Sequence, residues 1–421
     1  MEDKYLYLFS LAVILLSTKF LGLISRRVQL PAVVGALISG IILGPSFLDF
    51  IEYTDFIQKA SEIGVILLMF MAGLDTDLDE LKKSGLASFL VAVLGVVLPL
   101  LGGFLCFKYM FPEEYANNSL GFLKAVFVGI TLTATSVSIT VETLREMGKL
   151  KGKMGTTIMG AAIIDDIVGI IVLTTITSMQ DTSVNPTIVL VKIVMFFIFV
   201  VLTGGVVFFL KNKFIGSVKR RRRISIYALA FCLFMSFIAE EGFGVADITG
   251  AFIAGLIISN TNKSMFVRIK FDTISYMLLS PVFFASIGLK VVLPEMTPAI
   301  IWFSVVLVIV AIVTKVIGCG IGAKVCGYQN YQAKRIGVGM ISRGEVALIV
   351  ASKGTALGLL GGNFLGPVVI VVIFTTIITP VLLKIVFKKA PPIPVSETIT
   401  ESESLAKELE QVMKSRGEER K

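Results

Sequence analysis

Histidine is absent from this 421-residue chain, and only 16% of its residues are charged. Without histidine the protein lacks the commonest metal ligand and the side chain that most readily changes charge near neutral pH. Soluble domains average about 25% charged residues, so the low charge argues against soluble, disordered and nucleic-acid-binding classes. The chain is 55% hydrophobic, with a mean hydropathy of +0.88. We therefore expect an all-α integral membrane protein whose surface mostly faces lipid, and no nucleic-acid partner.

Cysteine is also scarce, and its four copies have no metal-type spacing, so we expect buried free thiols. The N-terminus runs from Met-Glu-Asp-Lys directly into an apolar stretch, without the basic start and cleavage site of a signal peptide. We expect this stretch to be the first transmembrane helix. The cysteines are Cys106, Cys232, Cys319 and Cys326.

About thirteen stretches are apolar enough to be transmembrane helices, since a helix needs roughly 20 residues to cross a bilayer. The loops after the odd-numbered stretches, with the adjoining span ends, hold twenty-one lysines and arginines, and the opposite side holds six. The positive-inside rule then places the N-terminus outside and the C-terminus in the cytoplasm. The predicted spans are 5–24, 31–49, 60–74, 85–107, 121–142, 155–178, 187–210, 224–240, 245–260, 271–289, 297–323, 335–354 and 363–388.

Charges in the middle of a span need an explanation, because each costs about 2.5–3.5 kcal/mol at the bilayer centre. Asp165 and Asp166 lie in the middle of the span 155–178, and Lys315 is the only cation in the apolar run around it. Neighbouring helical residues point about 100° apart, so the two carboxylates face different partners. An unpaired buried charge is unfavourable, and we expect Lys315 to pair with one of the aspartates.

Two predicted spans contain interruptions. Residues 129–144 are rich in hydroxyls, including Thr133, Thr135 and Ser136, which compete with helical hydrogen bonds. Residues 337–354 place Arg343, Gly344 and Glu345 in mid-span, where Arg343 and Glu345 are expected to form a local ion pair. These are spans five and twelve, the fifth of each six-span half when span seven is a connector. Interruptions at matching positions of inverted repeats indicate a transport site.

The chain resembles the monovalent cation:proton antiporters of the NapA and Kef types, and more distantly NhaA. The resemblance extends over most of the predicted membrane part and is carried by seven segments together. These are LPAVVGALISGIILGP at 30–45, EIGVILLMFMAGLDTDLDEL at 62–81, ATSVSIT at 134–140, GAAIIDDIVGII at 160–171, ITGAFIAGLIIS at 248–259, SPVFFASIGL at 280–289 and SRGEVALIVAS at 342–352.

The resemblance implies an NhaA-like fold of inverted repeats with two crossed discontinuous helices, assembled as a homodimer in the cell membrane. Residues 1–389 would form the transmembrane antiporter domain, and 390–421 a short charged cytoplasmic tail in place of a regulatory nucleotide-binding domain. A core is implied within 85–178 and 297–388, an interface domain within 5–74 and 224–289, and a connector at 187–210.

The resemblance also implies roles for individual residues. Asp166 would bind Na⁺ or K⁺, Asp165 would pair with Lys315, and Thr135 and Ser136 would line the site. Thr133, Arg343 and Glu345 would support it from mid-membrane. The double aspartate favours a stand-alone Na⁺ antiporter over a K⁺ efflux system, although K⁺ and Li⁺ remain open.

The expected activity is transport rather than enzymatic catalysis, with no cofactor beyond the transported ions. A carboxylate in a low-dielectric site can hold a proton or a cation but not both, which suffices for exchange if only loaded states change sides. Exchange is expected to be electrogenic if Lys315 also releases a proton. The alternatives are a sodium-coupled organic-solute symporter of related fold and a K⁺ efflux system. Adjacent aspartates on one helix do not suit an intramembrane aspartyl protease.

Overall fold

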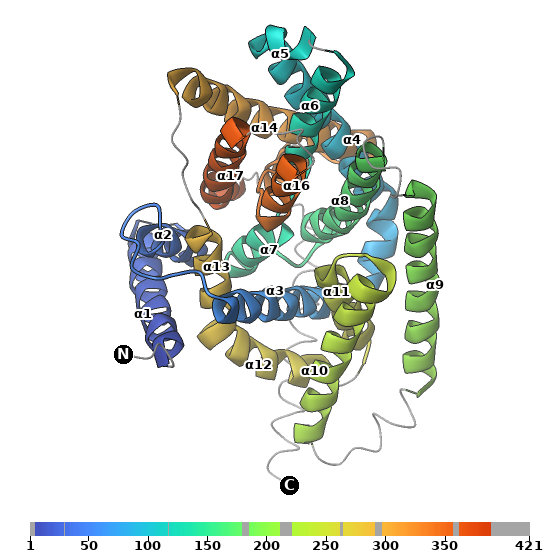
Figure 1. The fold of residues 1–421 in the computed structure, drawn as a ribbon. Coiled ribbons are helices and arrows are strands. Elements are labelled where there is room, and N and C mark those ends of the chain that lie inside the picture. The colour runs from blue at the N-terminus through green and yellow to red at the C-terminus, as the bar shows by residue number, and fades with distance from the viewer. Residues whose placement is uncertain are drawn as a thin grey trace.

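The computed structural model describes residues 5–28, 30–116, 118–178, 185–210, 221–261, 264–290, 297–356 and 362–388. These residues form helices joined by short connections (Figure 1). In the first half the helices are α1 Leu6–Arg27, α2 Ala32–Leu43, α3 Asp55–Asp75, α4 Leu78–Met110, α5 Pro112–Ala116, α6 Asn118–Thr131, α7 Val137–Glu146, α8 Lys153–Ser178 and α9 Pro186–Leu210.

The second half continues with α-helices and two short π-helical segments, named η3 and η4. They are α10 Arg221–Phe237, η3 Ile238–Gly242, α11 Asp247–Ser259, α12 Ser264–Ile274, η4 Ser275–Leu279, α13 Ser280–Leu289, α14 Pro298–Val325, α15 Asn330–Gly339, α16 Glu345–Ala356 and α17 Gly362–Lys388. Every predicted span overlaps one of these helices or a consecutive set of them. The predicted tail at 390–421 lies outside the described residues.

Within the described residues, nine helices are long and apolar enough to cross a membrane, and three shorter apolar helices accompany them. The predicted span 31–49 is shorter than expected, because α2 ends at Leu43. There Gly44 takes an extended conformation and Pro45 follows, and neither continues a helix. The structure therefore shows a multi-span helical membrane protein in which several predicted spans are short or divided.

Long helices α4 and α14 pack against each other, and α4 also packs against α6 and α8. Helix α3 packs against α11 and α13, while α2 packs against α1 and α13. Helix α9 touches both α8 and α11, and Figure 1 shows it along one edge of the molecule, opposite α1 and α2. Its apolar side chains are widely exposed, with Val201 at 72%, as expected for a helix that faces lipid.

Small residues let two of these helices approach at the backbone. A Cβ on Gly73 of α3 would lie 2.1 Å from the Phe252 carbonyl oxygen of α11, and a Cβ on Gly255 would lie 2.1 Å from the Phe70 oxygen. Helices in membranes associate through such small-residue contacts, because lipid provides no hydrophobic drive to bring them together. Glycine at both positions therefore holds α3 and α11 together.

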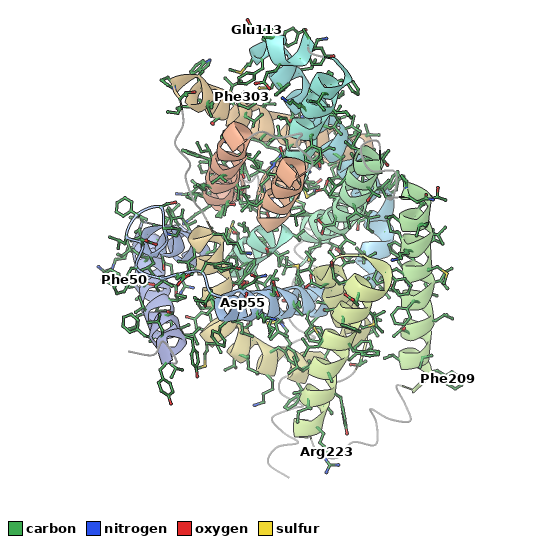
Figure 2. The ribbon with its side chains drawn as sticks, in the orientation of Figure 1. Phe50, Asp55, Glu113, Phe209, Arg223 and Phe303 are labelled. Atoms are coloured by element: carbon green, nitrogen blue, oxygen red, sulfur yellow. The ribbon has the colours of Figure 1, made fainter. Side chains whose placement is uncertain are left out.

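The two ends of the molecule carry charges of opposite sign among the labelled side chains. Figure 2 shows Glu113 of α5 and Arg223 of α10 at opposite ends. Phe209, near the end of α9, points outward and is 87% exposed. The acidic helix α5, which follows α4, and the basic start of α10 thus lie at opposite ends of the molecule.

Candidate ion site

Both predicted interruptions are present, and each separates two helices. The first separates α6, which ends at Thr131, from α7, which begins at Val137. Local hydroxyls explain where α6 ends: Thr131 donates to the Val128 carbonyl at 2.7 Å, and Thr133 donates to the Ile130 carbonyl at 2.8 Å. Such bonds occupy carbonyls that a continuing helix would need. The second interruption separates α15, which ends at Gly339, from α16, which begins at Glu345.

The two interruptions contact each other. The backbone N–H of Ser136 donates to the Ser342 carbonyl at 2.8 Å, and the Ser342 hydroxyl donates to the Ser136 carbonyl at 2.6 Å. Thr140 adds a bond to the Gly339 carbonyl at 2.7 Å. A Cβ at Gly344 would lie 2.6 Å from the Ser136 Oγ, so the close approach requires glycine there. Non-helical backbone at membrane depth is thus buried within protein, where it is tolerated.

Arg343 is fully buried beside this contact and donates to backbone carbonyls. Its guanidinium reaches the carbonyl of Leu132 at 2.7 Å, that of Ala311 at 3.1 Å and that of Ile341. The positive charge therefore satisfies carbonyls that follow the C-terminal ends of α6 and α15, where the helix dipole is negative. The expected pairing of Arg343 with Glu345 involves a side chain that lies outside the described residues.

Lys315 of α14 is buried and meets Asp165 of α8. Its Nζ lies 3.0 Å from Asp165 Oδ1 and 3.2 Å from Oδ2, and it also donates to the Thr133 carbonyl at 2.9 Å. Side-chain exposure is 0% for Lys315 and 1% for Asp165. The lysine thus joins the aspartate-bearing helix to the first interruption. Removing either partner would leave a buried charge unpaired.

Asp166 faces a different part of the molecule. It is half-buried and lines a cavity of about 10 Å³, together with residues of α3, α7 and α11. Consecutive carboxylates thus diverge as helical geometry predicts. Asp165 is committed to Lys315, whereas Asp166 lines a space at the junction of four helices, α3, α7, α8 and α11 (Figure 1).

The remaining predicted site residues lie in or beside the first interruption. Thr135 and Ser136 are both buried, at 2% and 5% exposure. The Ser136 hydroxyl lies 3.3 Å from that of Ser138. In the described parts of the chain, no three cysteine or carboxylate side chains gather into a metal-type cluster. Thr133, Thr135 and Ser136 are not among the residues that line the Asp166 cavity.

Two groups of residues were missed by the sequence reasoning. Thr249 of α11 lines the Asp166 cavity, but a single threonine in an apolar run gives no signal. Arg145 and Arg268 also form ion pairs with acidic residues between helices, although in sequence they resemble ordinary cytoplasmic loop charges. Only the packing of α3, α7 and α12 brings these partners together.

The interrupted helices, the buried lysine–aspartate pair and the apolar exterior define a multi-span membrane transport protein. A family model described as "Sodium/hydrogen exchanger, transmembrane" matches residues 12–389. The chain belongs to this family of membrane antiporters.

Individual relatives agree with this assignment. The chain is 42% identical over 385 residues to the Na⁺/H⁺-K⁺ antiporter GerN of Bacillus cereus, covering 91% of this chain and 97% of that protein. It is 37% identical to a Na⁺/H⁺ antiporter of Enterococcus hirae, covering 90% and 97%. The solved structure of the sodium proton antiporter MjNhaP1 from Methanocaldococcus jannaschii aligns with a TM-score of 0.64, covering 91% of this chain and 96% of that one. At 15% identity, this last likeness supports the fold alone.

Proposed function

We propose that this protein exchanges protons for a monovalent cation, Na⁺ or K⁺, by alternating access in the cell membrane. One observation carries the proposal: adjacent carboxylates on α8 have different surroundings, with Asp165 bound to Lys315 and Asp166 in a small cavity. Asp166 would take either a proton or a cation, and both loaded forms are less costly to move through an apolar barrier than the bare carboxylate. The named antiporters among the relatives support this function and give the symporter alternative no support.

The moving part would be a core within residues 85–178 and 297–388, carrying both interruptions in a crossed, NhaA-like arrangement of inverted repeats. The static part would lie within 5–74 and 224–289, with 187–210 as connector. The packing of α4 against α14, α6 and α8 supports this division, as does the packing of α3 against α11 and α13. Thr133, Thr135 and Ser136 would supply oxygens at the first interruption, beside the Asp165–Lys315 pair, and Arg343 would hold the interruptions in place.

Lys315 makes the proposed cycle electrogenic. A cation that draws Asp165 away from Lys315 would favour release of the lysine proton, so that two protons cross for each cation. Such a cycle responds to membrane voltage at about 2.3 kcal/mol per charge per 100 mV. The N-terminus would lie outside and the C-terminus in the cytoplasm, and no cofactor is needed.

Reconstituted protein tests the exchange directly. Proteoliposomes with an acidic interior receive Na⁺, K⁺ or Li⁺ outside, or choline as the control, and the internal pH is followed by a fluorescent dye. At least one alkali cation should dissipate the gradient, and choline should not. Failure of all three with correctly inserted protein would contradict the proposal, and cation-dependent solute uptake without proton movement would identify a symporter.

The voltage response tests the role of Lys315. A potassium–valinomycin potential of either sign is imposed while Na⁺-driven proton flux is followed, provided that the protein does not carry K⁺ itself. The rate and the end point should both shift with the sign of the potential. Flux indifferent to voltage would return Lys315 to a purely structural role.

We also propose a homodimer formed through the first spans, on the resemblance alone. Cross-linking and mass measurement in lipid nanodiscs should give two copies for each particle. Full exchange by a monomer in a bilayer would contradict this assembly.

A further inference from the structure

The hydroxyl of Thr249 is buried without a partner. Thr249 is 1% exposed, and across the residues that the structure describes its Oγ1 finds no hydrogen-bond acceptor or donor. Buried polar groups are almost always paired, and an exception calls for a ligand or another cause. Among the helical threonines that the structure describes, Thr249 is the one with a buried hydroxyl that lacks a hydrogen-bond partner.

The position of Thr249 in its helix explains the missing bond. Thr76, Thr143 and Thr157 each donate to the carbonyl four residues earlier, at 2.7 Å. Thr249 is the third residue of α11, so no helical turn precedes it to offer that carbonyl. Thr249 is instead one of the residues that line a small cavity.

That cavity is the one that Asp166 lines. Thr249 and Asp166 supply its polar wall, and the other seven lining side chains are apolar. Its volume of about 10 Å³ is close to that of one water-sized sphere, so it has room for one small desolvated species between α8 and α11. A carboxylate and a hydroxyl in one otherwise apolar cavity suit a cation, because both present oxygen lone pairs.

Further negative charge lies at the start of α11. Asp247 precedes Thr249 by two residues, and its backbone N–H donates to the Glu240 carboxylate at 3.1 Å. Two carboxylates beside the helix that carries Thr249 raise the local concentration of cations. An anionic occupant would be repelled by these carboxylates.

We propose that the Thr249 hydroxyl is an oxygen ligand of the transported monovalent cation, supplied from α11 to the ion held at Asp166. The proposal rests on the proposed function and extends the ion site beyond the core to the helix group of α3 and α11. Since Thr249 and Asp166 lie on elements expected to move relative to each other, the hydroxyl is a ligand in the arrangement seen here and is lost when the core shifts. It thereby sets affinity and ion preference on one side of the membrane.

Thr249→Val is the decisive variant, because it keeps the branched shape and removes the oxygen. In the proteoliposome assay we expect the KM for the transported cation to rise roughly tenfold, equivalent to about 1.4 kcal/mol, with the maximal rate within about twofold of the parent. The ratio of Na⁺ to K⁺ KM values should change as well. Thr249→Ser should restore the parent values, since it restores the hydroxyl.

A matched control is Ser236→Ala in α10. Ser236 is likewise buried with an unpartnered hydroxyl but does not line the cavity, so its removal should leave KM unchanged. The melting temperature of Thr249→Val in detergent should equal or exceed that of the parent, because a buried unpaired hydroxyl does not support the fold. A KM unchanged in Thr249→Val, or one raised only together with a fall in melting temperature, would overturn the proposal.

Cation binding gives a readout that does not need transport. A ligand that binds the folded state raises the melting temperature as its concentration passes Kd. Thr249→Val should need about ten times more NaCl than the parent for the same rise, with choline chloride as the ionic-strength control. If the parent binds Na⁺ but exchanges no cation, the proposed function fails. The difference in NaCl dependence between parent and Thr249→Val then still tests whether Thr249 is a ligand. Equal NaCl dependence in parent and variant would refute the assignment alone.

Discussion

Two ion-paired regions of this protein differ in what they connect. Asp165 and Lys315 form a fully buried pair between α8 and α14, both of which pack on α4. The bridging cluster, which we define as Asp75, Arg145, Arg268 and Asp272, joins α7 to α3 and α12, and Asp272 in it is 60% exposed. In the proposed cycle the first belongs to the moving core and opens only when a cation draws Asp165 away from Lys315, whereas the second would have to change when the core moves. The fully buried Asp165–Lys315 pair is therefore suited to ion coupling, whereas the bridging cluster is suited to holding one conformation.

The closest pairs of the bridging cluster are short. Arg145 lies 2.6 Å from Asp272, and Arg268 lies 2.7 Å from Asp75. Arg145, Arg268 and Asp272 are partly exposed, although the Asp75 side chain is only 3% exposed. Water and salt therefore compete with these contacts, and each is worth less than its distance suggests. The Asp165–Lys315 pair is shielded from bulk salt, because neither side chain is more than 1% exposed.

The largest expected effect is on Asp166, which belongs to neither region. Asp166→Asn keeps the shape but cannot bind a cation by charge or cycle a proton, so we expect exchange to fall to the level of empty liposomes. The melting temperature should stay near that of the parent, since Asp166 is only half-buried. Substantial cation-driven proton movement by the purified variant would refute the assignment.

The next largest effect is expected for the buried Asp165–Lys315 pair. Asp165→Asn leaves Lys315 as an unpaired buried charge, and we expect a loss of about 3–5 kcal/mol, seen as a large fall in melting temperature in detergent. The double variant Asp165→Asn with Lys315→Met should recover much of that loss, because no bare charge remains. If the double variant melts below both single variants, the pair is a net source of stability and the comparison fails.

The bridging cluster should give a smaller, salt-dependent effect. Arg145→Gln removes the contact with Asp272 and weakens that with Asp75, and we expect a loss of about 1 kcal/mol at low salt. In 1 M choline chloride, which screens charge without supplying the transported cation, the difference from the parent should shrink, because the partly exposed contacts are screened. Asp165→Asn serves as the control, since its destabilisation should persist in high salt. If the stability losses of the two variants respond equally to salt, the two regions do not differ in their exposure to screening.

The smallest effect is expected at the surface. Lys82 and Asp79 lie 3.9 Å apart in the first turns of α4, with 69% and 83% side-chain exposure. Lys82→Gln should change stability by less than about 0.5 kcal/mol, as for exposed helical pairs. If Lys82→Gln lowers the melting temperature as much as Arg145→Gln does, solvent exposure does not determine how much these contacts stabilise the protein.

Local chemistry allowed much of the central architecture to be anticipated from the sequence. Mid-span charge pointed to Asp165, Asp166 and Lys315, and hydroxyl-rich sequence located the first interruption. The bonds between Ser136 and Ser342 and the wall formed by Thr249 depend on packing between segments far apart in the chain. Periodicity within one helix carries no information on such contacts. The sequence therefore predicted the buried charged residues better than the uncharged residues that surround them.

The contact between the interruptions also constrains the order of assembly. Ser136 and Ser342 are 206 residues apart, so the first interruption is synthesised long before its partner. Until residues near 342 enter the bilayer, its open backbone groups must be shielded by water, by the insertion machinery or by earlier helices. Insertion of the last helices is thus the step that completes the site, and truncation before α15 should leave a chain prone to quality-control degradation.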